Sequence, residues 1–310
     1  MPAPLRWGVL GGSSRIARNA VIPALTGSDR HEVVAVASRG ADGGFASYDE
    51  LLARPDVEIV YNPLPNGMHR EWCERAFAAG KHVLCEKPLG MNEADATAIF
   101  AAADEAGCTV VEAYMTPFHP QSELLEGLVQ GGRLGDVRSV HASFTFTLDH
   151  PDDHRFTRLG DGALLDVGIY CTAPILRWAD REPVTVAATA RRNEAGVVTT
   201  VSAWLDFGEG LTGSFEVSFE QPFRQVLEVV GNRGAVRLGR AFVPGRADTE
   251  VNLVQVDGSV ETLYCEPGDP YEGLVDHVHA VLRDGVSPRH GRHQTLAVAR
   301  LLDRVRAATT

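Results

Sequence analysis

Few cysteines and no long hydrophobic run are the first features of this chain, and each shortage excludes classes of protein. Its 310 residues include five cysteines, an odd number, and no two of them have Cys-x-x-Cys spacing. We therefore expect reduced thiols in a cytoplasmic protein, and we expect no metal site, because no His, Asp or Glu cluster has ligand spacing. No apolar run approaches the roughly 20 residues that a membrane span needs. The short run at residues 7–10 leads into a glycine turn, which is not typical of a signal peptide.

Basic residues are also scarce, because 29 Lys and Arg face 41 Asp and Glu, which gives a formal net charge of -12. An acidic chain repels nucleic acids and anionic membranes, so we expect neither as a partner. The densest basic stretch, residues 283–300, is itself interrupted by Asp284. With 44% hydrophobic and 23% charged residues, the composition is that of a globular protein, and the length is compatible with two domains.

The first half of the chain alternates short β-branched runs with helical stretches. Strands are predicted at residues 5–10, 32–37, 57–61, 82–85 and 109–112, and helices at 14–25, 48–53, 70–79 and 93–106. Alternation of this kind indicates βαβ units and a parallel sheet. We therefore predict an N-terminal α/β domain over residues 1–118 with a doubly wound, dinucleotide-binding (Rossmann) sheet.

After about residue 136 the pattern changes to apolar–polar alternation, which is typical of half-exposed antiparallel strands. Strands are predicted at residues 137–147, 185–191, 197–207, 210–219, 224–231, 235–238, 251–256 and 259–264, and helices at 271–283 and 294–307. We predict a second, α+β domain over residues 119–310: a mostly antiparallel sheet flanked by helices, for substrate binding and oligomerisation. In one arrangement of this domain, its C-terminal helix packs back on the first domain.

A glycine-containing turn follows the first predicted strand. There the backbone can approach a pyrophosphate, and the next helix offers free N–H groups. The match to G-x-G-x-x-G/A is imperfect, since Gly11 fits the first position, Ser13 replaces the second glycine and Ala17 comes one residue late. Spacing alone leaves cofactor binding and an ordinary turn equally plausible. The candidate cofactor residues here are Gly11, Gly12, Ser13, Ser14, Arg15 and Ile16.

The end of the second predicted strand bears on the choice between NAD and NADP. An acidic residue there would accept hydrogen bonds from the ribose 2′-hydroxyl, but this strand ends in Ser38 and Arg39. A hydroxyl and a guanidinium suit a 2′-phosphate, so we favour NADP(H) over NAD(H); the less favoured alternative is that Arg39 is a solvated surface residue. The adjoining stretch, residues 40–47, is short.

Four motifs in order resemble the glucose–fructose oxidoreductase / inositol dehydrogenase family over nearly the whole chain. They are YNPLPNGMH at residues 61–69, KHVLCEKPL at 81–89, EAYM at 112–115 with HPQ at 119–121, and GALLDVGIY at 162–170. The resemblance implies the two-domain fold predicted above and an oxidoreductase activity. In that family the stretch at 40–47 normally holds a full helix and a short strand, and this chain is too short there for both.

The resemblance implies that Lys87 and Tyr170 are the catalytic pair, with Asp166 orienting the substrate or the lysine. An ammonium at the carboxyl end of a parallel strand can polarise a carbonyl, and Pro88 restricts the backbone of Lys87. A phenol near an ammonium can act as a general acid. From the residues alone, Lys87 is equally a surface lysine, and Tyr170 is more commonly an aromatic core residue.

Other residues are assigned to the site with less support. Cofactor contacts are expected from Pro63, Leu64, Pro65, Asn66, His69, Glu86, Lys87 and Glu112. Glu86 could instead support Lys87, and His69 could simply begin a helix. His119 and Arg155 are candidates for the substrate, Arg155 because it lies in a polar loop before the GALLDVGIY motif; a lone histidine such as His119 is more often structural.

The sequence thus predicts an NADP(H)-dependent oxidoreductase that acts on a small sugar or sugar-like molecule, with ketosugar reduction favoured. An aldose dehydrogenase of xylose type or a trans-dihydrodiol dehydrogenase is the alternative. A non-catalytic, cofactor-binding regulator and a protein with a broken cofactor pocket are alternatives of other classes. An exposed face of the second sheet favours a homo-oligomer, a dimer or a tetramer.

Overall fold

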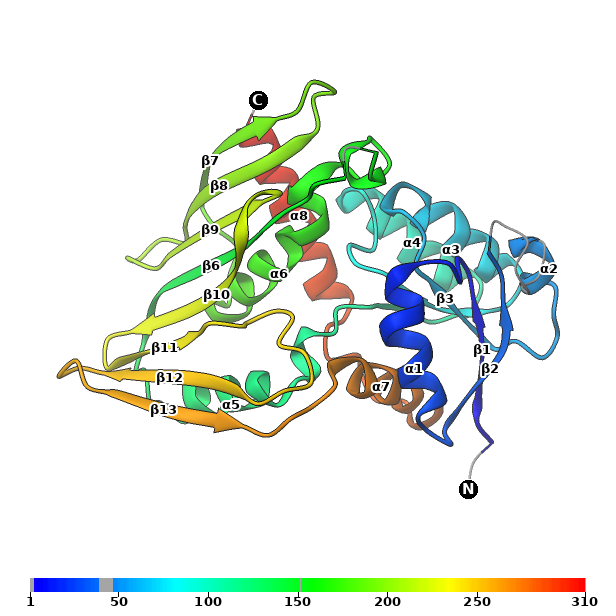
Figure 1. Cartoon of the computed structure of the whole chain (residues 1–310), viewed down its shortest axis with the longest axis horizontal. Helices are drawn as coiled ribbons and strands as arrows, with labels where there is room; N and C mark the ends of the chain where they lie inside the picture. Colours follow the sequence, from blue (N-terminus) through cyan, green and yellow to red (C-terminus); the bar gives the residue numbers. More distant parts are fainter. Residues whose placement is uncertain (1–2, 39–46, 151, 310) are drawn as a thin grey trace. The chain divides into compact units, whose positions relative to one another are not determined.

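Two compact units make up the chain (Figure 1), whose computed structural model describes residues 3–38, 47–150 and 152–309. The first unit comprises Met1–Met115 and Pro270–Leu296, and the second comprises Thr116–Asp269 and Ala297–Thr310. The first boundary, at 115/116, lies three residues before the predicted 118/119, and residues 270–296 return to the first unit. They return because helix α7 (Pro270–Asp284) buries Leu274, Val275 and Val278 and packs against α1.

A five-stranded sheet in the order β2-β1-β3-β4-β5 forms the centre of the first unit. The strands are β1 Leu5–Val9, β2 His31–Val36, β3 Ile59–Asn62, β4 His82–Cys85 and β5 Val110–Glu112, and every neighbouring pair is parallel. All four residues of β3 are buried, as expected of a strand covered on both faces. The prediction of a parallel, doubly wound domain is confirmed.

Helices connect these strands. The first runs over residues 15–26 and contains a π-helical segment, η1 Ala17–Val21, before α1 Ile22–Thr26. It is followed by α2 Tyr48–Leu52, the short η2 Asn66–Met68, α3 His69–Ala78 and α4 Glu93–Glu105. Side-chain caps begin two of them, because Ser47 accepts from the Glu50 N–H and Asn92 from the Asp95 N–H. The wide π turn precedes Pro23, which cannot supply a helical N–H.

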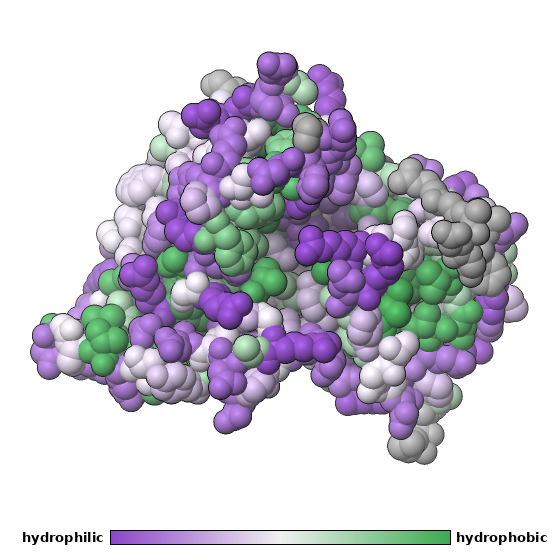
Figure 2. All heavy atoms as spheres, viewed as in Figure 1, coloured by the Kyte–Doolittle hydropathy of each residue, from purple (hydrophilic) through white to green (hydrophobic). Residues whose placement is uncertain are grey.

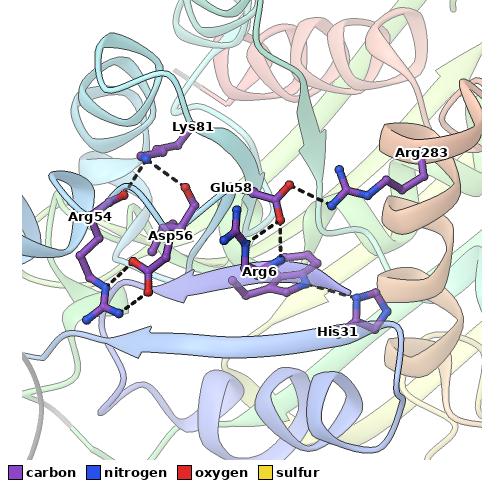
Figure 3. A network of polar contacts seen from close by, with 9 residues as sticks. Arg6, His31, Arg54, Asp56, Glu58, Lys81 and Arg283 are labelled. Atoms are coloured by element: carbon purple, nitrogen blue, oxygen red, sulfur yellow. Dashed lines mark hydrogen bonds and ion pairs between the residues drawn. The ribbon is translucent and has the colours of Figure 1, made fainter. Parts of the chain in front are cut away.

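A network of charged and polar groups joins α7 to the sheet (Figure 3). Glu58, just before β3, accepts from the Arg6 guanidinium at 3.1 Å and from Arg283 of α7 at 2.9 Å. At the start of β2, the His31 ring accepts from the Trp7 indole N–H at 3.2 Å. These contacts lie at the amino ends of the strands. They hold the unit together and leave the carboxyl ends, where doubly wound sheets bind ligands, to other residues.

An eight-stranded sheet in the order β13-β12-β11-β10-β6-β9-β8-β7 forms the second unit. Its strands are β6 Val137–Thr147, β7 Thr185–Arg192, β8 Val198–Asp206, β9 Thr212–Ser218, β10 Glu220–Gly231, β11 Gly234–Leu238, β12 Thr249–Gln255 and β13 Val260–Cys265. All neighbouring pairs are antiparallel except β6 and β9, which are parallel. The mostly antiparallel sheet is therefore confirmed, with strand bounds close to those predicted.

Helices flank this sheet, as expected. Helix α6 (Gly162–Ala179) packs on β6, β8 and β9, and α5 (Pro120–Gln130) packs on β12 and β13. The short η3 Thr116–Phe118 and η4 His154–Phe156 and the long α8 Arg292–Ala308 complete the list. Neither α5 nor α6 is among the helices predicted from the sequence. The start of α5 has a physical signature all the same, because Pro120 fills the first turn and the side chain of His119 accepts from the Gln121 N–H.

The surface seen in Figure 2 is mostly hydrophilic, with smaller hydrophobic areas between the polar ones. Within the part of the chain that the structure describes, no helix has the length and hydrophobicity to cross a bilayer. The same residues include no group of three or more His, Cys, Asp and Glu that could hold a metal ion.

Candidate active site

The turn after β1 is folded tightly against the end of β2. Gly11 has a φ of +62°, a conformation that side chains disfavour. The Gly12 N–H donates to Ala37 O at 2.8 Å, and a Cβ on Gly12 would lie 2.2 Å from Cγ1 of Val36. Both glycines are therefore required by the path of the chain, although the G-x-G-x-x-G/A pattern is incomplete.

The helix that follows begins at Arg15, so its first turn presents N–H groups without helical partners at the carboxyl end of β1. Ser13 and Arg15 are exposed, whereas Gly12, Ser14 and Ile16 are partly exposed. Free N–H groups beside small, exposed residues are what a dinucleotide pyrophosphate needs, so these residues fit an NAD(P) cofactor. Ser38 is half-buried after β2; Arg39, the other predicted 2′-phosphate ligand, lies outside the described residues.

The loop after β3 is organised from inside by Asn62 and His69. Asn62 is fully buried; its amide donates to the His69 carbonyl at 3.4 Å, and its side-chain oxygen accepts from the Leu64 N–H at 3.3 Å. His69 is also fully buried, and its Nε2 lies 2.8 Å from Leu64 O. Pro63 and Leu64 are buried too, whereas Pro65 and Asn66 are partly exposed. Of the residues predicted to contact the cofactor here, Pro65 and Asn66 are thus the more accessible ones.

The loop after β4 carries Lys87, which is partly exposed, between buried neighbours. Glu86 accepts from the Tyr61 hydroxyl at 2.6 Å, and its other oxygen accepts from the Lys87 N–H at 3.3 Å. Burial and the Glu86 carboxylate raise the pKa of Tyr61 well above its usual value, which keeps the phenol a donor. The Lys87–Pro88 peptide bond is cis. Of the two roles predicted for Glu86, these contacts favour support of Lys87.

Glu112 ends β5 and is buried, with 3% of its surface exposed. Its oxygens accept from the Leu89 N–H and from the Thr295 hydroxyl, each at 2.7 Å. His290 Nε2 lies 3.2 Å from the second oxygen. Burial acts to raise the pKa of Glu112, but His290, Thr295 and Leu89 hold it below its usual value. Glu112 is therefore a buried carboxylate whose contacts point inward.

In the second unit, Tyr170 and Asp166 lie one turn apart on α6. Asp161 and Gly162 have positive φ at the start of this helix, and a Cβ on Gly162 would lie 2.1 Å from Val198 O, so the start of α6 is fixed against β8. The Tyr170 ring is packed in a T-shaped contact on Phe144, with centroids 5.2 Å apart, and is tilted against Phe242 at 6.0 Å. Aromatic packing therefore sets the direction of the phenol.

Arg155 is held by carboxylates and not by hydroxyls. Its guanidinium makes a paired contact with Asp153, at 2.9 and 2.8 Å, and lies 3.5 Å from Asp166. Arg155 lowers the pKa of Asp153 to about 2, and Asp153 raises the pKa of Arg155. Arg155, which the sequence predicts to contact the substrate, thus has its positive charge compensated by carboxylates of its own unit.

His119 is fully buried, and its Nδ1 accepts from the Gln121 N–H. Its Nε2 is buried without a hydrogen-bond partner, and burial lowers the pKa of the ring. The observed contact is that of a helix cap, the structural alternative to the predicted substrate role.

Sequence reasoning missed the residues that support the site: Tyr61, Asn62, His290 and Thr295. Tyr61 and Asn62 begin the YNPLPNGMH motif, and polar residues at the end of a buried strand were the available signal. His290 and Thr295 had none, because they lie about 180 residues after Glu112, and only the return of residues 270–296 to the first unit brings them to it.

A glycine turn and a lysine loop at the carboxyl ends of a parallel sheet define a dinucleotide-dependent enzyme. A model of the oxidoreductase family with an NAD-binding Rossmann fold matches residues 5–114, and a model of the GFO/IDH/MocA C-terminal domain matches residues 123–237. The chain belongs to the GFO/IDH/MocA family of NAD(P)-dependent oxidoreductases, as its motifs predicted.

Several relatives are similar over three quarters or more of this chain. A D-xylose 1-dehydrogenase (NADP(+)) of Haloferax volcanii is 34% identical over 97% of this chain and 96% of its own. The solved structure of a 3-ketoreductase from Actinomadura kijaniata, in complex with NADP and TDP-benzene, is 33% identical, with a TM-score of 0.92 over 99% of this chain and 98% of its own. A trans-1,2-dihydrobenzene-1,2-diol dehydrogenase of Bos taurus is 34% identical over 76% of this chain and 74% of its own.

Proposed function

We propose that this oxidoreductase uses NADP(H) and transfers a hydride between the nicotinamide and a carbonyl or hydroxyl carbon of a sugar or sugar-like substrate, with reduction of a ketosugar favoured. The observation that carries the proposal is the support of Lys87, a partly exposed ammonium at the carboxyl end of β4, by Glu86 and Tyr61. A backbone fixed in this way is expected where a side chain must meet a reacting atom.

In the proposed reaction the cofactor, when bound, supplies or accepts the hydride. Lys87 donates a hydrogen bond to the substrate oxygen and stabilises the negative charge that develops on it. The Tyr170 hydroxyl donates a proton to the same oxygen in reduction and accepts it in oxidation. Asp166, one turn before Tyr170, orients the substrate hydroxyls or the lysine. A lysine and a tyrosine are also the residues replaced in variant structures of the Actinomadura relative.

The preference for NADP(H) rests on Ser38 and Arg39 in the sequence and on the absence of an acid at those positions. The Haloferax relative, a D-xylose 1-dehydrogenase (NADP(+)), and the Actinomadura structure, a complex with NADP, support it.

A second candidate function is the oxidation of a free aldose or a cyclic diol, and the state of Arg155 favours it. Two carboxylates already compensate this guanidinium. The phosphate of a nucleotide-linked sugar would therefore have to displace one of them in order to bind Arg155. Uncharged substrates do not meet this obstacle. The Haloferax and Bos taurus relatives are named for such substrates.

The test is a fluorescence titration with NADPH and NADH, with the four tryptophans as reporters, followed by assays in both directions. We expect at least about tenfold tighter binding of NADPH, a difference of 1.4 kcal/mol. NADPH oxidation is then followed with free and nucleotide-linked ketosugars, and NADP⁺ reduction with xylose and with a trans-dihydrodiol. Tight binding without turnover of any substrate would favour a non-catalytic regulator, and no binding would contradict the proposal.

The homo-oligomer stays a prediction. Trp204 on β8 and Val184, just before the edge strand β7, are exposed at 47% and 72%, and sedimentation velocity would measure the number of subunits.

A further inference from the structure

Two buried, titratable side chains hold the same peptide group, the one that joins Pro88 to Leu89. His69 Nδ1 lies 2.9 Å from the Pro88 carbonyl oxygen. On the other side of that peptide group, the Leu89 N–H donates to Glu112 at 2.7 Å. His69 comes from the start of α3 and Glu112 from the end of β5, so two separate elements fix a peptide group one residue after Lys87.

We propose that His69 and Glu112 are positioning residues that clamp the Pro88–Leu89 peptide and thereby set the direction of Lys87. This inference rests on the proposed role of Lys87. It differs from the cofactor contacts predicted for both residues, because His69 is 0% and Glu112 3% exposed, and their contacts are with other parts of the first unit.

Each side chain of the clamp is itself fixed by a second contact. The other oxygen of Glu112 accepts from Thr295, so the carboxylate cannot turn away without losing that bond. The other ring nitrogen of His69 faces Leu64 O at 2.8 Å, so the ring lies between carbonyl oxygens of the loops after β3 and β4. Such outer contacts hold reactive groups in place, and a displacement of about 1 Å can lower a rate about 100-fold.

Both ring nitrogens of His69 face carbonyl oxygens, which can only accept hydrogen bonds, so the protonation state of the ring decides how many of these bonds form. A neutral ring has one N–H and can bond one of them, whereas an imidazolium can bond both. Burial lowers the pKa of His69; of the charged groups facing it, Lys87 lowers that pKa further and Glu112 raises it. As the pH rises through this lowered pKa, the ring loses a proton and one of the two loops loses its bond.

The test compares His69→Gln and Glu112→Gln with His31→Gln. His31 is a matched control, because it is a buried histidine of the same unit with partners at both ring nitrogens, Trp7 and Asp276, at the opposite edge of the sheet. We expect kcat to fall about 10- to 100-fold in the two clamp variants, with the Kd for NADPH and the KM for substrate changed less than about threefold. His31→Gln should lower stability and leave kcat unchanged.

A second readout does not require activity: the exchange rate of the Leu89 amide hydrogen, followed by NMR in the whole protein. We expect faster exchange in both clamp variants and wild-type exchange in His31→Gln. An unchanged kcat in the clamp variants, or a loss of NADPH binding that accounts for their lower activity, would overturn the inference. A wild-type protein without activity would overturn the proposed function, and the Leu89 exchange would still decide whether the clamp exists.

Discussion

The two units fix their candidate catalytic side chains by different means. Around Lys87, buried hydrogen bonds from Glu86, His69 and Glu112 hold the backbone, and the ammonium itself stays partly exposed. Around Tyr170, aromatic rings pack on the side chain, and Arg155 forms ion pairs with Asp153 and Asp166. Directional bonds fix a loop, whereas packing fixes a side chain on a helix that is already rigid.

This difference predicts that the tyrosine can be altered with little structural cost and a large chemical one. Tyr170→Phe keeps the ring contacts with Phe144 and Phe242 and removes only the hydroxyl. We expect kcat to fall about 100- to 10,000-fold, the usual contribution of a general acid, and the melting temperature to change little. Steady-state kinetics and thermal unfolding measure the two effects. Activity within threefold of wild type would show that Tyr170 is only a core residue.

The lysine should behave as a charge on a fixed loop. Lys87→Met keeps most of the aliphatic stem and removes the ammonium, so we expect a fall in kcat of about 100- to 1,000-fold, as for the loss of one oxyanion donor. Because the supporting bonds are made to the backbone of this loop, NADPH affinity should stay within about threefold. Lys87→Arg is the matched control; it keeps the charge and should retain more activity than Lys87→Met. Equal loss in both variants would indicate that the shape of the ammonium matters more than its charge.

A substitution in the glycine turn should have a smaller effect, on the affinity for NADPH and not on kcat. Gly12→Ala places a methyl group on Val36, and overpacking of this kind costs about 1–3 kcal/mol. We expect NADPH to bind about tenfold more weakly, with kcat at saturating cofactor unchanged. The double variant with Val36→Ala makes room for the methyl and should recover most of the affinity, as measured by the same fluorescence titration. No recovery would mean that the glycine is needed for approach to the cofactor itself.

The same comparison explains which parts of the fold and of the site could be predicted from the sequence. Strand bounds in both units followed from hydrophobic periodicity, and Lys87, Glu86 and Tyr170 from motifs whose residues are close in sequence. The partners of Glu112 could not be found in this way, because His290 and Thr295 reach it only through the return of α7 to the first sheet. Helix α5 was missed because its cap is a histidine, an uncommon residue at that position. Arg155 was predicted as a substrate contact from its place in a polar loop. Its pairing with two carboxylates, which argues against binding of a charged substrate, depends on how that loop folds and could not be predicted.

The ion pair at Arg155 gives the smallest effect, and it depends on pH. Asp153 has a pKa of about 2 in the folded chain and a usual value of 3.8. A carboxyl with a lowered pKa contributes stability that is fully present above about pH 4 and is lost as the pH falls towards 2. Because the pair is partly solvated, we expect Asp153→Asn to lower the free energy of unfolding by about 1 kcal/mol near neutral pH.

Urea unfolding of the wild type and of Asp153→Asn, at neutral pH and at successively lower pH, measures this difference. We expect it to shrink below about pH 4, where the wild-type carboxyl begins to lose its ionised form. Asp303→Asn is the control, because Asp303 also faces an arginine, Arg306, at 3.5 Å, and this longer contact should contribute less. A difference that does not change with pH would mean that Asp153 does not stabilise the loop through its charge. In that case Arg155 would be less compensated than its geometry indicates, and the argument for an uncharged substrate would weaken with it.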